Sequence, residues 1–178
     1  MAGRTPQEAV SNFLEPLGAV ISCLTNSVLS VRGGYSPAAE PHAMVLGEGG
    51  AIRLSGADLS LRIIQHYRIV EAAEQRGPWK ISTAAYMYSL ESPLGTELLA
   101  FHWHPAGRST VTTPHLHLGA AANVGHPALA NAHLPTGRIA IEDFVRLTIV
   151  AFRVRPLRDD WEEVLLRAQT AFDQWRTW

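Results

Sequence analysis

The sequence is short of the residues that many metal and redox sites require. It holds one cysteine, Cys23, so it can form neither an internal disulfide nor a zinc site built from several cysteines. Cys23 lies in the apolar run Val20–Leu24, which predicts a buried, inert thiol. No apolar run reaches the roughly 18 residues of a membrane span. The first residues include no long hydrophobic stretch, so we expect no signal peptide and a cytoplasmic protein.

Charge is also sparse. The formal net charge is −1, which gives no global field for nucleic acid or membrane, so any basic site must be local. Lys80 is the single lysine among 15 basic residues. Arginine suits phosphate and carboxylate partners, although a compositional bias would produce the same excess. No aspartate, glutamate or cysteine occurs between Glu97 and Glu142, so ligands drawn from this segment would have to be histidines.

The pattern of apolar residues predicts a single α+β domain over residues 1–178, with a mostly antiparallel sheet and helices at both ends. A short N-terminal helix is expected from Thr5 to Leu14, with Thr5 as its cap and a proline in its first turn. We expect strands at 19–31 (interrupted at 25–26), 43–46, 51–54, 59–70, 79–90, 97–104 and 115–118. Residues 71–78 read as a polar turn and 119–136 as irregular structure.

Two amphipathic helices are expected at the C-terminal end. The first presents one apolar face between Ile141 and Phe152 and is stopped by Pro156. The second opens with an Asp-x-x-Glu capping box at Asp160. Its buried face is predicted to comprise Trp161, Val164, Leu165, Ala168, Phe172 and Trp175. Exposed tryptophans at this end, Trp178 among them, could support a homodimer.

Histidines are concentrated in one short part of the chain. Six of the eight lie between residues 102 and 133. Side chains alternate across a strand, so His102 and His104 share one face, and His115 and His117 do the same. If the two segments are neighbours in the sheet, four imidazoles converge on one face while Trp103 and Leu116 pack on the core. This cluster is the best candidate for a functional site.

Three interpretations of the cluster stay open. Convergent imidazoles are natural ligands of a divalent transition metal such as zinc, which His102, His104, His115 and His117 would hold. Alternatively, His104 and His117 could act as a metal-free acid–base pair on a phosphodiester, with Arg108 or Arg138 on the phosphate. The third interpretation is structural, with histidines that are exposed or hydrogen-bonded and take part in no chemistry.

The central region of the chain resembles the TumE-type toxins of bacterial toxin–antitoxin pairs. The resemblance runs from Leu59 to Phe152, through a strand with Tyr86 and Tyr88, a turn at Gly95 and a strand ending in His104-Pro105. It continues through the segment Pro114-His115-Leu116-His117-Leu118-Gly119 to a helix that opens with Glu142 and Asp143. Where the family carries an Asp-Asn pair, this chain has Phe101-His102-Trp103.

The resemblance implies a toxin-like protein that acts on RNA or nucleotides and is inhibited by a partner. Together with the histidines it leads us to expect a toxin-like or defence-associated phosphodiester hydrolase with RNA as substrate. Its site residues would be His102, His104, His115, His117, Arg108 and Arg138. The alternative is a non-catalytic or regulatory metal-binding module that uses the same four histidines.

Overall fold

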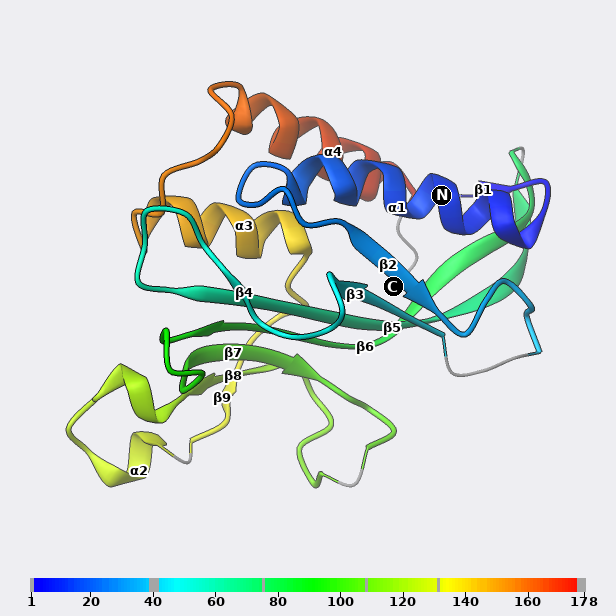
Figure 1. Cartoon of the computed structure of the whole chain (residues 1–178). Helices are drawn as coiled ribbons and strands as arrows, with labels where there is room; N and C mark the ends of the chain where they lie inside the picture. Colours follow the sequence, from blue (N-terminus) through cyan, green and yellow to red (C-terminus); the bar gives the residue numbers. More distant parts are fainter. Residues whose placement is uncertain (1, 39–41, 75, 108, 131, 176–178) are drawn as a thin grey trace.

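The fold consists of one curved antiparallel sheet with three helices packed on one side of it. The structure, a computed structural model, describes residues 2–38, 42–74, 76–107, 109–130 and 132–175. Figure 1 shows α1 (Pro6–Ile21), α3 (Ile141–Val150) and α4 (Trp161–Trp175) together on one side of the sheet. The loop that carries α2 (Pro127–Ala130) lies away from these helices (Figure 1). The expected α+β class, with its antiparallel sheet and terminal helices, is confirmed.

The sheet follows the order β2-β3-β5-β6-β7-β8-β9, and every neighbouring pair on this path is antiparallel. Two short strands lie off the path, where β1 pairs with β6 and β4 pairs with β5. The strands are β1 (Ala2–Gly3), β2 (Leu29–Arg32), β3 (His42–Leu46), β4 (Ile52–Arg53), β5 (Ser60–Glu74), β6 (Gly77–Glu91), β7 (Glu97–Trp103), β8 (His115–Leu118) and β9 (Leu134–Pro135).

Helix α1 begins as the sequence predicts but is longer. The Thr5 hydroxyl accepts a hydrogen bond from the backbone N–H of Glu8 at 3.1 Å, as an N-cap does. The helix then continues past Pro16 to Ile21, so the strand expected from residue 19 is wrong over its first part, and β2 starts only at Leu29. The apolar residues after Pro16 recur at helical spacing and form part of the buried face of α1. The burial of this face outweighs their preference for strands.

The long hairpin β5–β6 forms the centre of the sheet. Strand β5 extends to Glu74 and β6 begins at Gly77. The polar turn expected over residues 71–78 is therefore wrong over most of its length, which is strand. Pairing of β1 with β6 at Gly3 and Trp79 extends the sheet into this region. The predicted hairpin turn between β6 and β7 is confirmed, because the N–H of Gly95 donates to the carbonyl of Ser92 at 2.9 Å. The strand predicted at 115–118 coincides with β8.

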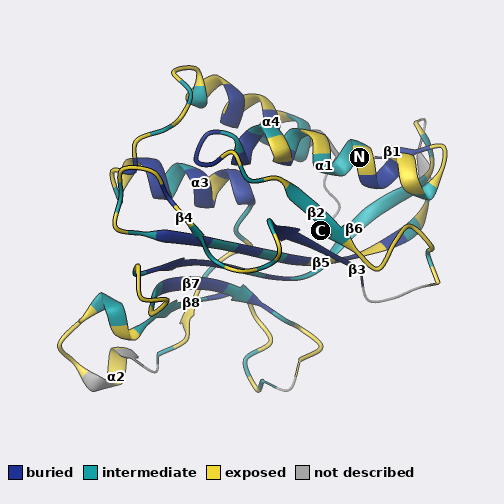
Figure 2. Cartoon of the chain, viewed as in Figure 1, coloured by how far each residue is buried: buried dark blue, intermediate teal, exposed yellow. Residues whose placement is uncertain are grey.

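The core lies between the sheet and the three helices, where buried residues gather in Figure 2. Helix α3 contributes Phe144, which packs edge-on against Phe101 of β7 with ring centroids 6.0 Å apart. Helix α4 buries Val164 and Leu165, as expected, but Asp160 binds Arg158 through its carboxylate instead of forming the expected capping box. The side chain of Trp175 and all of Trp178 lie outside what the structure describes, so the homodimer stays a prediction.

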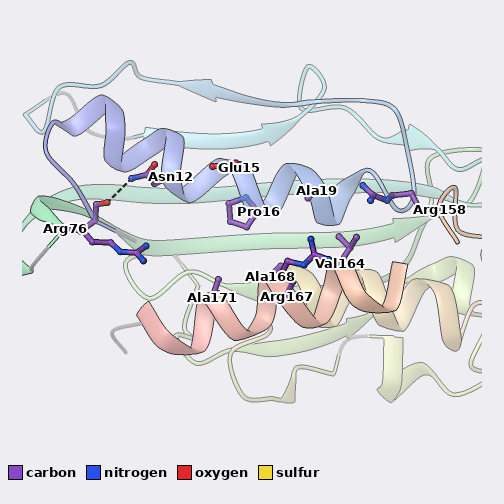
Figure 3. A pocket seen from close by; sticks show the side chains of 11 residues that line it. Asn12, Glu15, Pro16, Ala19, Arg76, Arg158, Val164, Arg167, Ala168 and Ala171 are labelled. Carbon is purple, nitrogen blue, oxygen red and sulfur yellow. Dashed lines mark hydrogen bonds between the residues drawn. The ribbon is translucent and has the colours of Figure 1, made fainter. Parts of the chain in front are cut away.

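A groove of about 560 Å³ runs between α1 and α4 on the outer side of the helix layer (Figure 3). Arg76 and Arg158 lie toward its two ends, and Arg167 lies on α4. Arg158 already binds Asp160 and the hydroxyl of Ser22, and Arg167 pairs with Glu163. The groove is on the helix side of the sheet, away from the histidine-bearing face. Among the described helices, none is long and apolar enough to cross a membrane.

Candidate metal centre

Strand pairing brings the two His-x-His segments together. In the β7–β8 ladder His102 lies directly opposite His115, and His117 lies opposite Ala100. Leu99, Phe101 and Trp103 alternate with these residues and are buried against the helix layer. The imidazoles therefore lie on the face of the sheet that is turned away from the helices. The predicted pairing and the predicted division of faces are both confirmed.

A fifth imidazole joins the four that the sequence singles out. The β8–β9 register pairs His115 with Pro135 and Leu116 with Leu134, and its continuation places His133 beside His117. Their ring centroids are 4.3 Å apart, and those of His133 and His115 are 4.9 Å apart. We call these five residues (His102, His104, His115, His117 and His133) the histidine cluster. His126 is exposed and stays outside it.

The rings form a contiguous group. The centroid separations are 4.7 Å between His102 and His117, 4.9 Å between His115 and His117, and 5.7 Å between His102 and His115. The ring of His104 also belongs to this group, with its centroid 5.5 Å from that of His115. Most of the close ring pairs are tilted or edge-on, an arrangement that lets ring nitrogens approach one another.

Hydrogen bonding fixes the orientation of His115. Its Nδ1 lies 2.7 Å from the carbonyl oxygen of Thr113, and only a protonated nitrogen can donate to a carbonyl. In the neutral imidazole the Nε2 atom then carries the lone pair. It is buried and, among the described residues, has no hydrogen-bond partner, and the same is true of Nε2 of His102. Buried polar atoms normally have partners, so two unpartnered nitrogens in one cluster indicate a place for a ligand.

Two imidazoles of the cluster are held neutral. Burial, followed by the charges of neighbouring histidines, lowers the pKa of His102 to about 4. Burial and then His133 and His115 lower the pKa of His117. A neutral imidazole keeps a lone pair for a metal ion, whereas a protonated one does not. At pH 7 His102 and His117 therefore each keep a lone pair that can bind a cation.

Two sets of three histidines have the geometry of a metal site. In the inner triad (His102, His104 and His115) the ligand nitrogens all lie within 4.8 Å of one another, and the same holds for the outer triad (His115, His117 and His133). The ligands of one tetrahedral zinc ion lie about 3.4 Å apart, so small ring rotations close either triad around an ion. Among the described residues no carboxylate or thiolate joins these sets. The donor set consists entirely of imidazoles.

Of the two predicted arginines, Arg138 does not join the histidine cluster. The guanidinium of Arg138 stacks on the ring of Trp103 at 3.7 Å, and Trp103 faces the helix layer. Arg138 therefore lies on the side of the sheet opposite to the imidazoles. Arg108 lies outside the described residues, so its predicted contact with phosphate stays a prediction.

The sequence signal for His133 is weak. It lies in a segment rich in alanine, glycine and proline, and β9 is only two residues long and includes Pro135. Only the pairing of β9 with β8 shows that His133 belongs with His117. The role of the Thr113 carbonyl has no sequence signal, because any residue supplies a carbonyl.

Comparison with protein-family models, with curated proteins and with solved structures finds no match to the chain. The function has to be argued from the histidine cluster itself.

Proposed function

We propose that this protein binds a divalent transition-metal ion, zinc in the first instance, through three imidazoles of the histidine cluster. The observation that carries the proposal is the state of His115, whose Nδ1 donates to the Thr113 carbonyl while its buried Nε2 has no partner in the part of the chain that the structure describes. Metal-binding histidines are typically oriented in this way, with the second nitrogen hydrogen-bonded to a carbonyl or carboxylate. The unpartnered Nε2 of His102 beside it supplies a second ligand.

The same features disfavour metal-free acid–base chemistry. A general acid must be protonated near neutral pH, and burial lowers the pKa of His117, which disfavours that role for this member of the expected pair. That chemistry also needs a cation on the phosphate, and Arg138 lies on the opposite face of the sheet. A metal ion would supply the positive charge that the described residues around the imidazoles lack.

Three protein ligands leave a fourth position of a tetrahedral ion for water. A zinc ion held by these imidazoles would lower the pKa of a bound water and so supply a nucleophile for hydrolysis near neutral pH. We therefore favour metal-assisted hydrolysis as the reaction, with a phosphodiester of RNA as the expected substrate. The resemblance to TumE-type toxins adds a toxin-like role in the cytoplasm and an inhibiting partner protein.

Zinc affinity tests the proposal directly. Tag-free, chelator-treated protein is titrated with Zn²⁺ against a chromophoric chelator, together with His115→Ala. We expect the substitution to weaken zinc binding by at least about 100-fold, because it removes the ligand common to both triads. His66→Ala is the matched control, since His66 is exposed on β5 and lies outside both triads. Equal affinity in wild type and His115→Ala would refute the proposal.

The hydrolytic step has a separate test. Zinc-loaded wild type should cleave a fluorescent single-stranded RNA, whereas the metal-free protein and His115→Ala should not. Expression of the wild type in a bacterial host should also slow growth more than expression of His115→Ala. Cleavage by the metal-free protein at the same rate would instead favour the acid–base pair.

A further inference from the structure

We propose that the histidine cluster holds one metal ion in either of two positions that share His115. The outer triad receives the ion from solvent, and the inner triad retains it. This inference rests on the proposed function and adds a route by which the ion reaches its final ligands. Two observations support the inference: the two triads overlap at His115, and they differ in burial.

His115 makes the two positions mutually exclusive. A neutral imidazole offers one lone pair, and the Nδ1 of His115 is already the donor to Thr113. Only Nε2 is left for a metal, so His115 can serve one ion at a time. Both triads require it, and therefore both cannot be filled together. The protein should bind one ion per chain, although it has five histidines in the cluster.

Burial makes the two positions unequal. His133 is exposed and His117 is half-buried, so the outer triad is accessible to a hydrated ion. The inner triad contains His102 and His115, whose Nε2 atoms are both buried and have no hydrogen-bond partner among the described residues. An ion bound there gives both nitrogens a partner, whereas an ion in the outer triad leaves His102 without one. The free energy of binding should therefore favour the inner triad.

The ring arrangement connects the two positions. His117 of the outer triad lies 4.7 Å from His102 of the inner triad, measured between ring centroids. An ion held by His115 can exchange its outer ligands for inner ones in succession, because imidazoles line the whole path.

Two single substitutions separate capture from retention. Zn²⁺ affinity is measured by chelator competition, and the uptake rate by stopped-flow mixing with a fluorescent zinc indicator. His104→Ala removes an inner ligand and should weaken affinity about tenfold or more with little change in uptake rate. His133→Ala removes an outer ligand and should slow uptake about tenfold while affinity changes less than about threefold. His126→Ala is the control, an exposed histidine of the same region outside both triads.

The outcomes distinguish this inference from the proposed function. Two zinc ions per wild-type chain, or unchanged affinity in His104→Ala, would overturn the two-position scheme and leave the metal centre standing. Unchanged uptake in His133→Ala would overturn the role of the outer triad. Absence of zinc binding by the wild type would overturn the proposed function itself. Circular dichroism of each variant, with His104→Asn as a second inner substitution, separates loss of a ligand from loss of fold.

Discussion

At the scale of single residues, His115 determines what the cluster can do. It lies between the other imidazoles, and one backbone carbonyl, that of Thr113, fixes which of its nitrogens is free. Alternation along strands is enough to predict that His102, His104, His115 and His117 share a face. It cannot predict the tautomer, because a carbonyl partner is supplied by the course of the backbone and not by a residue type.

Arg138 gives a residue-scale prediction. Its guanidinium stacks on Trp103 on the helix side of the sheet, so Arg138→Gln should leave zinc affinity and any RNA cleavage within about twofold of wild type. Loss of the cation–π contact should cost about 0.5–1 kcal/mol of stability, since the side chain is exposed. Chelator competition and urea denaturation measure the two quantities. A large loss of cleavage with an intact fold would instead place Arg138 on the substrate.

At the scale of elements, the β7–β8 pair builds the site. Gly119 follows β8, and its N–H donates to the carbonyl of Leu98 at 2.9 Å. A Cβ at this position would lie 2.1 Å from the carbonyl oxygen of Glu97, a contact that only backbone movement can relieve. The close approach of β7 and β8 at this end therefore depends on glycine.

Gly119→Ala should destabilise the protein by about 2 kcal/mol or more and should weaken zinc binding, because the register of His115 opposite His102 is disturbed. Gly137→Ala is the control, since a Cβ there meets nothing within 4 Å, and its effect should stay within about 0.5 kcal/mol. Urea denaturation of the metal-free proteins measures the difference. Equal stability of the two variants would show that β8 tolerates the displacement.

Helix α3 supplies a pH-dependent prediction. Glu142, in its first turn, is 3% exposed, and burial raises the pKa of its carboxyl to about 7. Between pH 4.5 and 7 the folded protein keeps this proton while the unfolded chain releases it. The contribution of Glu142 to stability is therefore present at low pH and is lost as the pH rises to 7, by about 3 kcal/mol.

Glu142→Gln keeps the size of the side chain and removes the ionisation. Relative to wild type, the variant should gain stability as the pH is raised from 5 to 8. Urea denaturation at both pH values measures this difference, and comparison with wild type cancels the titration of the histidines. A constant difference between the two proteins would show that Glu142 ionises without cost in the fold.

The helices and strands also show how much of the fold the sequence pattern predicts. The sequence pattern predicts β8 at its correct bounds and β7 to within one residue, and in β8 polar and apolar residues alternate strictly. The pattern fails at residues 19–21, where β-branched residues belong to α1 because the layer above the sheet buries them. It also misses β9, whose two residues are too short for a period, and with β9 it misses the place of His133.

At the scale of the whole molecule, the two faces of the sheet carry different kinds of side chain. The helix-covered face holds the apolar core, including Phe101 and Trp103 of β7. The opposite face, on β7 and β8, holds His102 and His115, whose Nε2 atoms have no hydrogen-bond partner among the described residues. A metal ion bound on this face would link β7, β8 and the segment before β9, so it should stabilise the folded chain in proportion to the logarithm of its concentration above Kd.

The metal content of the purified protein tests the central claim most directly. Tag-free wild type and a His115→Ala/His117→Ala double variant, both purified without chelator, are analysed for transition metals by mass spectrometry. We predict close to one equivalent of metal in the wild type and a near-complete loss in the variant, because the variant lacks ligands of both triads. Absence of metal from both proteins, also after incubation with Zn²⁺, would contradict the account.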